Sequence, residues 1–136
     1  MRSTTPSGDL GRLRQIPGLE SAPHDELAVL DELADECSFF AGHVIVRRGC
    51  VPRQVLVVVS GAVRVISDDD PEPEIVGAGG VVGLRPVLQG VTHTEEAVVV
   101  TDVEVLGVGT EVLDRVLALP SVGRVVDPDG IRPASG

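Results

Sequence analysis

The stretch "VVGLRPVLQGVTHTEEAV", residues 81–98, carries the side chains of this sequence best suited to contact a charged ligand. Arg85 can pair with an anion, and His93 can do so when it is protonated. Thr94, next to His93, adds a hydroxyl group. The same stretch can also be a plain connector, in which Arg85 faces water or a nearby acid and His93 is a turn residue.

Other chemistries find little support in the sequence. The histidines His24, His43 and His93 are scattered, whereas metal-binding jelly rolls of the cupin class need clustered histidines. We therefore expect all three to be surface or turn residues. Ser60 adjoins Gly61 in a tight turn, without a matched histidine and acid to activate its hydroxyl group. We expect no enzyme activity, no metal site and no cofactor.

The charge balance restricts the partners of the chain. Twenty-one acidic residues against eleven basic ones give a formal net charge of −10, which repels the phosphates of nucleic acids. All the basic residues are arginine, which indicates a G+C-rich genome and hence a bacterium. The first ten residues are polar, and no apolar run reaches the roughly 18 residues of a membrane helix. We therefore expect a cytoplasmic protein that binds neither nucleic acid nor membrane.

Two cysteines, Cys37 and Cys50, are the only thiols of the chain. They do not form the Cys-x-x-Cys spacing of a redox or zinc motif. We expect buried thiols that are not joined to each other, and a disulfide or redox pair is the alternative.

The composition favours strands. Hydrophobic residues make up 43% of the chain, but the aromatic ones are only Phe39 and Phe40, so valine, leucine and isoleucine must build the core. Branching at Cβ suits strands, and the 16 glycines and 10 prolines suit turns. Short apolar runs from Cys37 to Gly109 predict about eight short strands, with an acidic turn at 67–74. The pattern alone predicts a mainly β sandwich or barrel, with jelly rolls included.

Helices are predicted at both ends of this series of strands. Ser21 and Pro23 open the first helix, whose apolar face runs through Leu27 to Cys37 at three-to-four spacing. Thr110 caps the second helix over residues 111–119, which stops at Pro120. The expected organisation is a disordered arm over 1–11, the roll domain over 12–125 and a disordered tail over 126–136.

A family resemblance appears in "FFAGHVIVRRGCVPRQVLVVVSGAVRVI". Its glycines and their flanking apolar runs resemble, in register, the cyclic-nucleotide-binding domain family, the β-roll of catabolite-activator-type regulators and kinase regulatory subunits. The resemblance covers roughly residues 13–125 and continues downstream through "TDVEVLGV". The residues that carry it are Phe39, Gly42, Gly49, Ser60, Gly61, Gly79, Gly83 and Gly90.

The resemblance implies a mainly β, eight-stranded jelly-roll-like β-roll with a phosphate-binding cassette in the opening stretch. In such a cassette a short helix, which Pro86 could open here, offers its first backbone N–H groups to the cyclic phosphate. In the family a glutamate after the cassette glycine binds the ribose, and a later arginine binds the cyclic phosphate. Here Leu84 stands at the glutamate position and His93 at the arginine position. Two lost hydrogen bonds to charged groups cost about 3–6 kcal/mol, which weakens binding roughly 10²- to 10⁴-fold. The candidate ligand-binding residues are Gly83, Leu84, Arg85, Pro86, His93 and Thr94.

Two functions remain open at this point. The first is a non-enzymatic regulatory module with weakened or lost binding of cAMP and cGMP, which acts through a partner protein. The alternative is a working sensor of a cyclic nucleotide or a related small molecule, which uses Arg85 and the backbone amides of the cassette. Family regulators usually continue into a long helix and often a DNA-binding module, whereas only "SVGRVV" follows Pro120 here before the polar tail.

Overall fold

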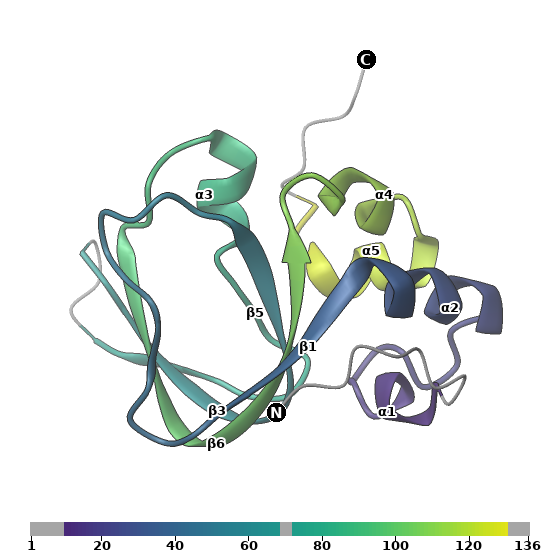
Figure 1. Cartoon of the computed structure of the whole chain (residues 1–136), viewed down its shortest axis with the longest axis horizontal. Helices are drawn as coiled ribbons and strands as arrows, with labels where there is room; N and C mark the ends of the chain where they lie inside the picture. The colour runs from purple at the N-terminus through teal and green to yellow at the C-terminus, as the bar shows by residue number, and fades with distance from the viewer. Residues whose placement is uncertain (1–9, 69–71, 131–136) are drawn as a thin grey trace.

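A computed structural model describes residues 10–68 and 72–130 of the chain, and Figure 1 shows its elements. The helices are α1 (Gly11–Arg14), α2 (His24–Leu33), α3 (Leu84–Gln89), α4 (Leu113–Leu117) and α5 (Pro120–Val126). The strands are β1 (Ala34–Phe39), β2 (Val44–Val46), β3 (Gln54–Ser67), β4 (Glu74–Val76), β5 (Val81–Val82) and β6 (Glu95–Gly109). The mainly β class with flanking helices is confirmed.

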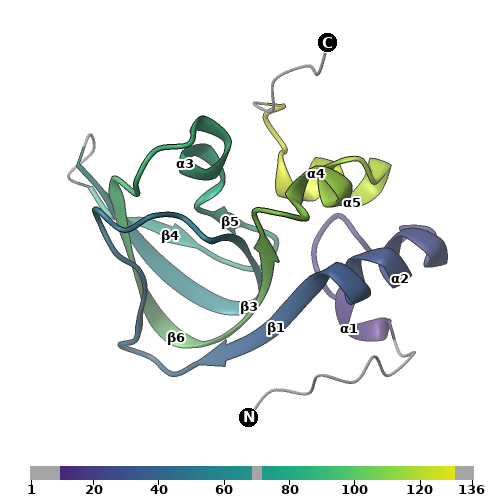
Figure 2. The same cartoon turned by 45° about the horizontal axis from the view of Figure 1, so that its top comes forward.

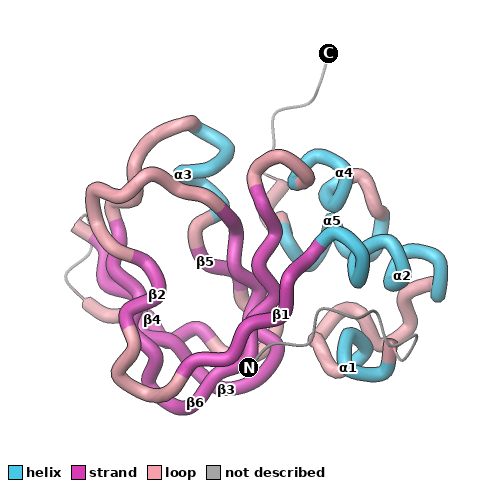
Figure 3. The backbone as a smooth tube through the Cα atoms, in the orientation of Figure 1, coloured by secondary structure: helices cyan, strands magenta, loops and turns pink. Residues whose placement is uncertain are grey.

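All the described strand pairs are antiparallel and belong to one six-stranded sheet, in the order β1-β6-β3-β4. The strands β2 and β5 pair with β6 and β3, respectively. The long strands β3 and β6 pair from Gln54–Gly109 to Ser67–Glu95 and curve together, so that the sheet rolls up (Figure 2). Helices α1, α2, α4 and α5 gather on one side of the roll, whereas α3 lies apart from them (Figure 3).

Strand β3 is one long strand that bends at Gly61, where the short apolar runs of the sequence predict two separate strands. Gly61 has a φ of +88°, and the pairing of β3 with β6 shifts register between Val58 and Val63. A side chain at Gly61 would collide with the carbonyl oxygen of Asp102 on β6. The glycine therefore marks a bulge and not a strand end. Because β6 is also continuous, the described residues form six strands and not the expected eight or so.

Two apolar cores lie on opposite faces of β3 and β6. Alternate residues of a strand point to opposite faces, so Val55 and Val57 pack against the helices while Leu56 and Val58 fill the roll. On β6, Val105 lies in the roll core, and Leu106 lies in the helix-side core. The valine-rich composition thus serves a sheet that is buried on both faces.

The helix boundaries correct several expectations. The first helix ends at Leu33, and Ala34 starts β1 by pairing with Val108 of β6. Its predicted extension to Cys37 is wrong because strand pairing satisfies this backbone. Pro23, not Ser21, is the residue that flanks the helix start.

The chain does not leave its helical part at Pro120. The last predicted helix begins at Leu113 and lacks the expected Thr110 cap, since Val112 precedes its first turn. Pro120 starts α5, a position where its missing N–H group costs no hydrogen bond. The Glu26 carboxylate of α2 caps this helix by accepting hydrogen bonds from the N–H groups of Ser121 (2.7 Å) and Val122 (3.3 Å).

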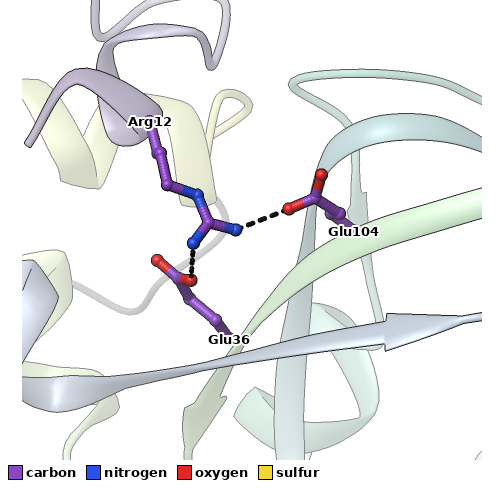
Figure 4. Close-up of polar contacts among 3 residues, drawn as sticks. All are labelled: Arg12, Glu36 and Glu104. Carbon is purple, nitrogen blue, oxygen red and sulfur yellow. Dashed lines mark hydrogen bonds and ion pairs between the residues drawn. The ribbon is translucent and has the colours of Figure 1, made fainter. Parts of the chain in front are cut away.

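The N-terminal segment is tied to the sheet from Leu10 onward. Leu10 is buried and Gly11 lies in α1, so the expected arm loses its last two residues to the fold. The remaining residues of the arm, 1–9, and residues 131–136 of the expected tail lie outside the described residues. Arg12 of α1 pairs with Glu36 of β1 and Glu104 of β6, at 2.6 Å each (Figure 4). This contact joins α1 to two strands of the sheet.

Candidate ligand-binding site

The predicted cassette folds as α3 between two glycines. Gly83 precedes the helix with a φ of +89°, and Gly90 follows it with a φ of +68°. Only glycine adopts this left-handed backbone without strain, which explains the spacing of the two glycines. Pro86 is the third residue of α3 and is buried, and its missing N–H group falls in the first turn, where helices have no internal acceptor.

Leu84 occupies the position where the resemblance implies a glutamate. Its side chain is only 8% exposed and belongs to the helix-side core. The side chain is therefore used for packing and offers no hydrogen bond to a ligand. Leucine cannot form the ribose hydrogen bond that the resemblance assigns to a glutamate at this position.

His93 is buried, which corrects the expectation of a surface or turn histidine. Its imidazole is 9% exposed, and a Cβ atom at Gly83 would lie 3.3 Å from its Cε1 atom. The backbone N–H group of His93 donates to the Cys50 carbonyl oxygen (3.0 Å), and the backbone carbonyl oxygen of His93 accepts from the N–H group of Gly49 (2.9 Å). This pairing with the 49–50 turn places the ring beneath Gly83, at the start of α3.

The burial of His93 changes its chemistry. No hydrogen-bond partner for its buried Nδ1 atom is present among the described residues. Desolvation lowers the pKa of the imidazole, so the ring is neutral near pH 7. A neutral ring can offer a hydrogen bond to a ligand, but it cannot supply the positive charge of the arginine that the resemblance implies.

Arg85 and Thr94 lie outside this buried group. Arg85 is exposed on α3, and within the described residues it forms no ion pair. Burial and the Glu74 carboxylate raise the pKa of Glu95, whereas Arg85 acts in the opposite direction, so Arg85 lies near Glu95. Thr94 is exposed, and its carbonyl oxygen accepts from the N–H group of Asp68. The structure thus brings His93 to Gly83 but leaves these two side chains in solvent.

A pocket that the sequence analysis missed lies against His93, and we call it the β2–β3 pocket. Its volume is about 280 Å³. It is lined by β2, the turn after it and the start of β3: Val44, Ile45, Val46, Arg47, Cys50, Val51, Arg53, Gln54, Leu56 and His93. The sequence signal for it is the group Arg47, Arg48 and Arg53 around one turn of an acidic chain. Arg85 and Thr94 do not line it.

The remaining expectations concern thiols, metals and membranes. Cys37 and Cys50 are not disulfide-bonded, but Cys50 is exposed, so the expectation of a buried thiol is wrong for it. In the described part of the chain, no group of three or more histidine, cysteine, aspartate or glutamate side chains is arranged to hold a metal ion. Within residues 10–68 and 72–130, no helix has the length and apolar character needed to span a membrane.

The rolled antiparallel sheet with its glycine-bounded helix defines a β-roll domain of the kind that the sequence resembles. The sequence profile of the cyclic nucleotide-binding domain family matches residues 36–119. The chain therefore belongs to the cyclic nucleotide-binding domain family. A search of the curated proteins found no match.

Solved structures share the fold at low sequence identity. A variant of the cAMP-binding acyltransferase from Mycobacterium smegmatis aligns with a TM-score of 0.74 and 19% identity, over 88% of this chain and 38% of that one. The regulatory subunit of a cAMP-independent protein kinase A from Trypanosoma brucei aligns with a TM-score of 0.71 and 21% identity, over 88% and 42%. The corresponding Trypanosoma cruzi subunit, bound to guanosine, gives 0.67 and 21%, over 87% and 41%. The chain thus spans only about two fifths of these structures.

Proposed function

We propose that the chain is a non-enzymatic regulatory module that binds cAMP and cGMP weakly or not at all and acts through a partner protein. The observation that carries this proposal is the state of the two cassette positions. Leu84 is packed into a core, and His93 is a buried, neutral ring. Neither can replace a charged contact to a sugar-phosphate.

The size of the effect supports weak binding. Two missing hydrogen bonds to charged groups correspond to about 3–6 kcal/mol of binding free energy, or roughly 10² to 10⁴ in affinity. The N–H groups at the start of α3 remain, but backbone amides alone supply only part of the original interaction. A site of micromolar affinity would become one of roughly 0.1–10 mM.

A role through a partner is consistent with the related structures. The three structures compared above are longer than the chain, and two of them are described as regulatory subunits of a cAMP-independent protein kinase A. This chain has the fold of such a regulatory domain, and the family has regulatory members. We infer that its output is a protein contact and not a reaction, because the described residues that share a pocket with Ser60 include Asp102 and Glu104 but no histidine to act as a base.

A second function keeps a ligand but changes its identity. In it the chain is a sensor of a cyclic nucleotide or a related small molecule, held by the amides of α3 and by Arg85. The neutral ring of His93 favours an uncharged ligand at this point, and the Trypanosoma cruzi structure is described as bound to guanosine, which has no phosphate. Arg85 would have to leave the neighbourhood of Glu95 to reach a ligand on α3.

Calorimetric titration with cAMP, cGMP and guanosine separates the two functions. The regulatory module predicts either no measurable heat of binding or a dissociation constant of about 0.1–10 mM. The sensor predicts saturable binding at micromolar concentration that Arg85→Ala weakens, whereas Arg64→Ala, an exposed arginine on β3, leaves it unchanged. Micromolar binding of cAMP to the unmodified chain would overturn the first proposal.

A further inference from the structure

The β2–β3 pocket has an unusual charge for this protein. Two arginines, Arg47 and Arg53, line it, and none of its described lining residues is acidic. The chain as a whole has a net charge of −10, so most of its surface carries the opposite sign. In the described part of the chain neither arginine forms an ion pair. Two positive charges therefore face one small pocket without a counterion from the protein.

The neighbouring arginine shows the contrast. Arg48 follows Arg47 directly, but its Nε atom pairs with the Asp68 carboxylate at 2.8 Å, and it also donates to the Ile66 carbonyl oxygen. Its charge is thus matched within the fold. Arg47 and Arg53 have no such partner among the described residues, so their guanidinium groups are available for a ligand there.

Hydrogen bonds order the backbone at both arginines. The Arg47 carbonyl oxygen accepts from the N–H group of Cys50 (3.3 Å), which closes the turn between the strands. The Arg53 carbonyl oxygen accepts from the N–H group of Thr110 at 3.2 Å. His93 pairs with the same turn from the other side. An ordered turn reduces the conformational entropy that a ligand must remove on binding.

The walls of the pocket strengthen an attraction to anions. Val46 and Leu56 are buried apolar residues of the roll core, and apolar walls lower the local dielectric constant. The pocket is further lined by His93, whose Nδ1 atom is buried without a partner in the described part of the chain. At about 280 Å³, the pocket suits a phosphate or a small dicarboxylate.

We propose that the β2–β3 pocket binds an anionic group, a carboxylate or a phosphate, through the guanidinium groups of Arg47 and Arg53. Guanidinium groups bind both anions through paired N–H donors, which is the strongest common recognition mode for these groups. The anion can belong to a small molecule or to a side chain of a partner protein. The site does not involve the N–H groups of α3, but it shares His93 with the cassette. Variants of Arg47 and Arg53, which lie outside the cassette, therefore distinguish this proposal from nucleotide binding by the cassette.

Nuclear magnetic resonance titration of the full chain tests the proposal. Sodium phosphate and sodium succinate are added separately, and the backbone amides of residues 47–51, 53 and 54 report binding. Sodium chloride at equal ionic strength and uncharged succinamide are the control solutes. We expect saturable shifts with a dissociation constant of millimolar order or below for phosphate, succinate or both, and none for the controls.

Variants connect the shifts to the two arginines. Arg47→Gln and Arg53→Gln should each weaken binding about tenfold or more, because each removes a charged donor. Arg64→Gln removes an exposed arginine outside the pocket and should leave the affinity unchanged. Spectra of each variant without ligand establish that it is folded.

A further arm distinguishes the sources of the anion. If a doubly acidic dipeptide with blocked ends binds as well as succinate, a partner side chain is the favoured source, and if only the small anions bind, a small molecule is favoured. Either result supports the site. The proposal is overturned if neither phosphate nor succinate gives saturable shifts, or if the affinity is equal in Arg47→Gln, Arg53→Gln and Arg64→Gln.

Discussion

His93 and Leu84 set the ligand chemistry of α3 at the scale of single residues. Both positions carry side chains that the fold has buried, and neither carries a charge near pH 7. The helix itself is kept, with its two glycines in the left-handed conformation. The cassette therefore keeps the glycine-bounded helix, whereas the glutamate and the arginine that the resemblance implies are replaced by Leu84 and His93.

Restoring the two side chains should restore nucleotide binding. The double variant Leu84→Glu/His93→Arg is expected to bind cAMP at least about 100-fold more tightly than the unmodified chain, because it regains two charged hydrogen-bonding groups. Calorimetry measures the affinity. The variant Leu84→Gln/His93→Gln, similar in size but uncharged, is the control. Equal affinity in the two double variants, both folded by circular dichroism, would show that these charges are not what the cassette lacks.

Acid should weaken the fold through His93. Burial lowers the pKa of its imidazole in the folded protein, so the unfolded chain, with a pKa near 6.5, takes up a proton first. The free energy of unfolding is therefore expected to fall as the pH drops below about 6.5, until the pH reaches the pKa of the folded state. Urea unfolding at about pH 7 and about pH 5.5 measures this fall.

Two variants assign this pH dependence. His93→Gln removes the titrating ring and should show a smaller fall between the two pH values. His24→Gln changes an exposed histidine at the start of α2 and should behave as the unmodified chain. An unchanged pH dependence in His93→Gln would contradict the assignment.

The connections between elements depend on a few specific contacts. The Glu26 side chain of α2 satisfies two N–H groups at the start of α5, and Gly61 lets β3 bend against β6. These contacts join segments that are far apart in the sequence. They explain why the helices and the roll hold fixed positions although the helices are short.

Removing the Glu26 cap should destabilise the fold. Glu26→Ala leaves the N–H groups of Ser121 and Val122 without their acceptor, at an expected cost of about 1–3 kcal/mol in the free energy of unfolding. Urea denaturation gives the value. Glu32→Ala, an exposed glutamate on the same helix, is the control and should change stability by less than about 0.5 kcal/mol. Similar effects of both substitutions would argue against a capping role.

Two glycine substitutions separate backbone strain from collision. Gly42 and Gly61 both have positive φ, but a Cβ atom meets nothing within 4 Å at Gly42, whereas at Gly61 it strikes Asp102 and lies 2.9 Å from the Cα atom of Val103. Gly42→Ala should cost about 1 kcal/mol. Gly61→Ala should cost about 1–3 kcal/mol more, measured by thermal or urea unfolding. Equal costs would mean that β6 yields easily at the bend.

At the scale of the whole molecule, the sequence predicts the class of fold but not the packing. The valine-rich runs predict a mainly β fold, and the ordered glycines carry the resemblance that implies a β-roll; both are confirmed. The end of α2 is missed because the apolar spacing through Ala34 and Cys37 continues into β1, where both residues are half-buried. Periodicity cannot distinguish a helix face from a strand that begins at the same place.

Neither the burial of His93 nor the β2–β3 pocket could be predicted from the sequence. His93 is polar and lies in a loop, so its neighbourhood in the sequence predicts exposure, and its burial comes from the 49–50 turn and α3 closing on it. The β2–β3 pocket likewise depends on segments that are distant in the sequence, from β2 to His93. The cassette positions Leu84 and His93, in contrast, could be identified from the resemblance, because that step needs only the order of residues.

Because β3 is buried on both faces, we expect the protein to unfold in a single transition. Val55 to Val58 are all buried, alternately in the helix-side core and the roll core, so neither core can open without stripping one face of the same strand. Leu27→Ala beneath the helices and Val63→Ala inside the roll should therefore each move one common transition, seen at the same urea concentration by amide signals from both sides. Two separate midpoints would mean that the helices can unfold while the roll stays folded. If the transition is common, β3 couples the helix-side core and the roll core into one cooperative unit, so a destabilising substitution in either core lowers the stability of both.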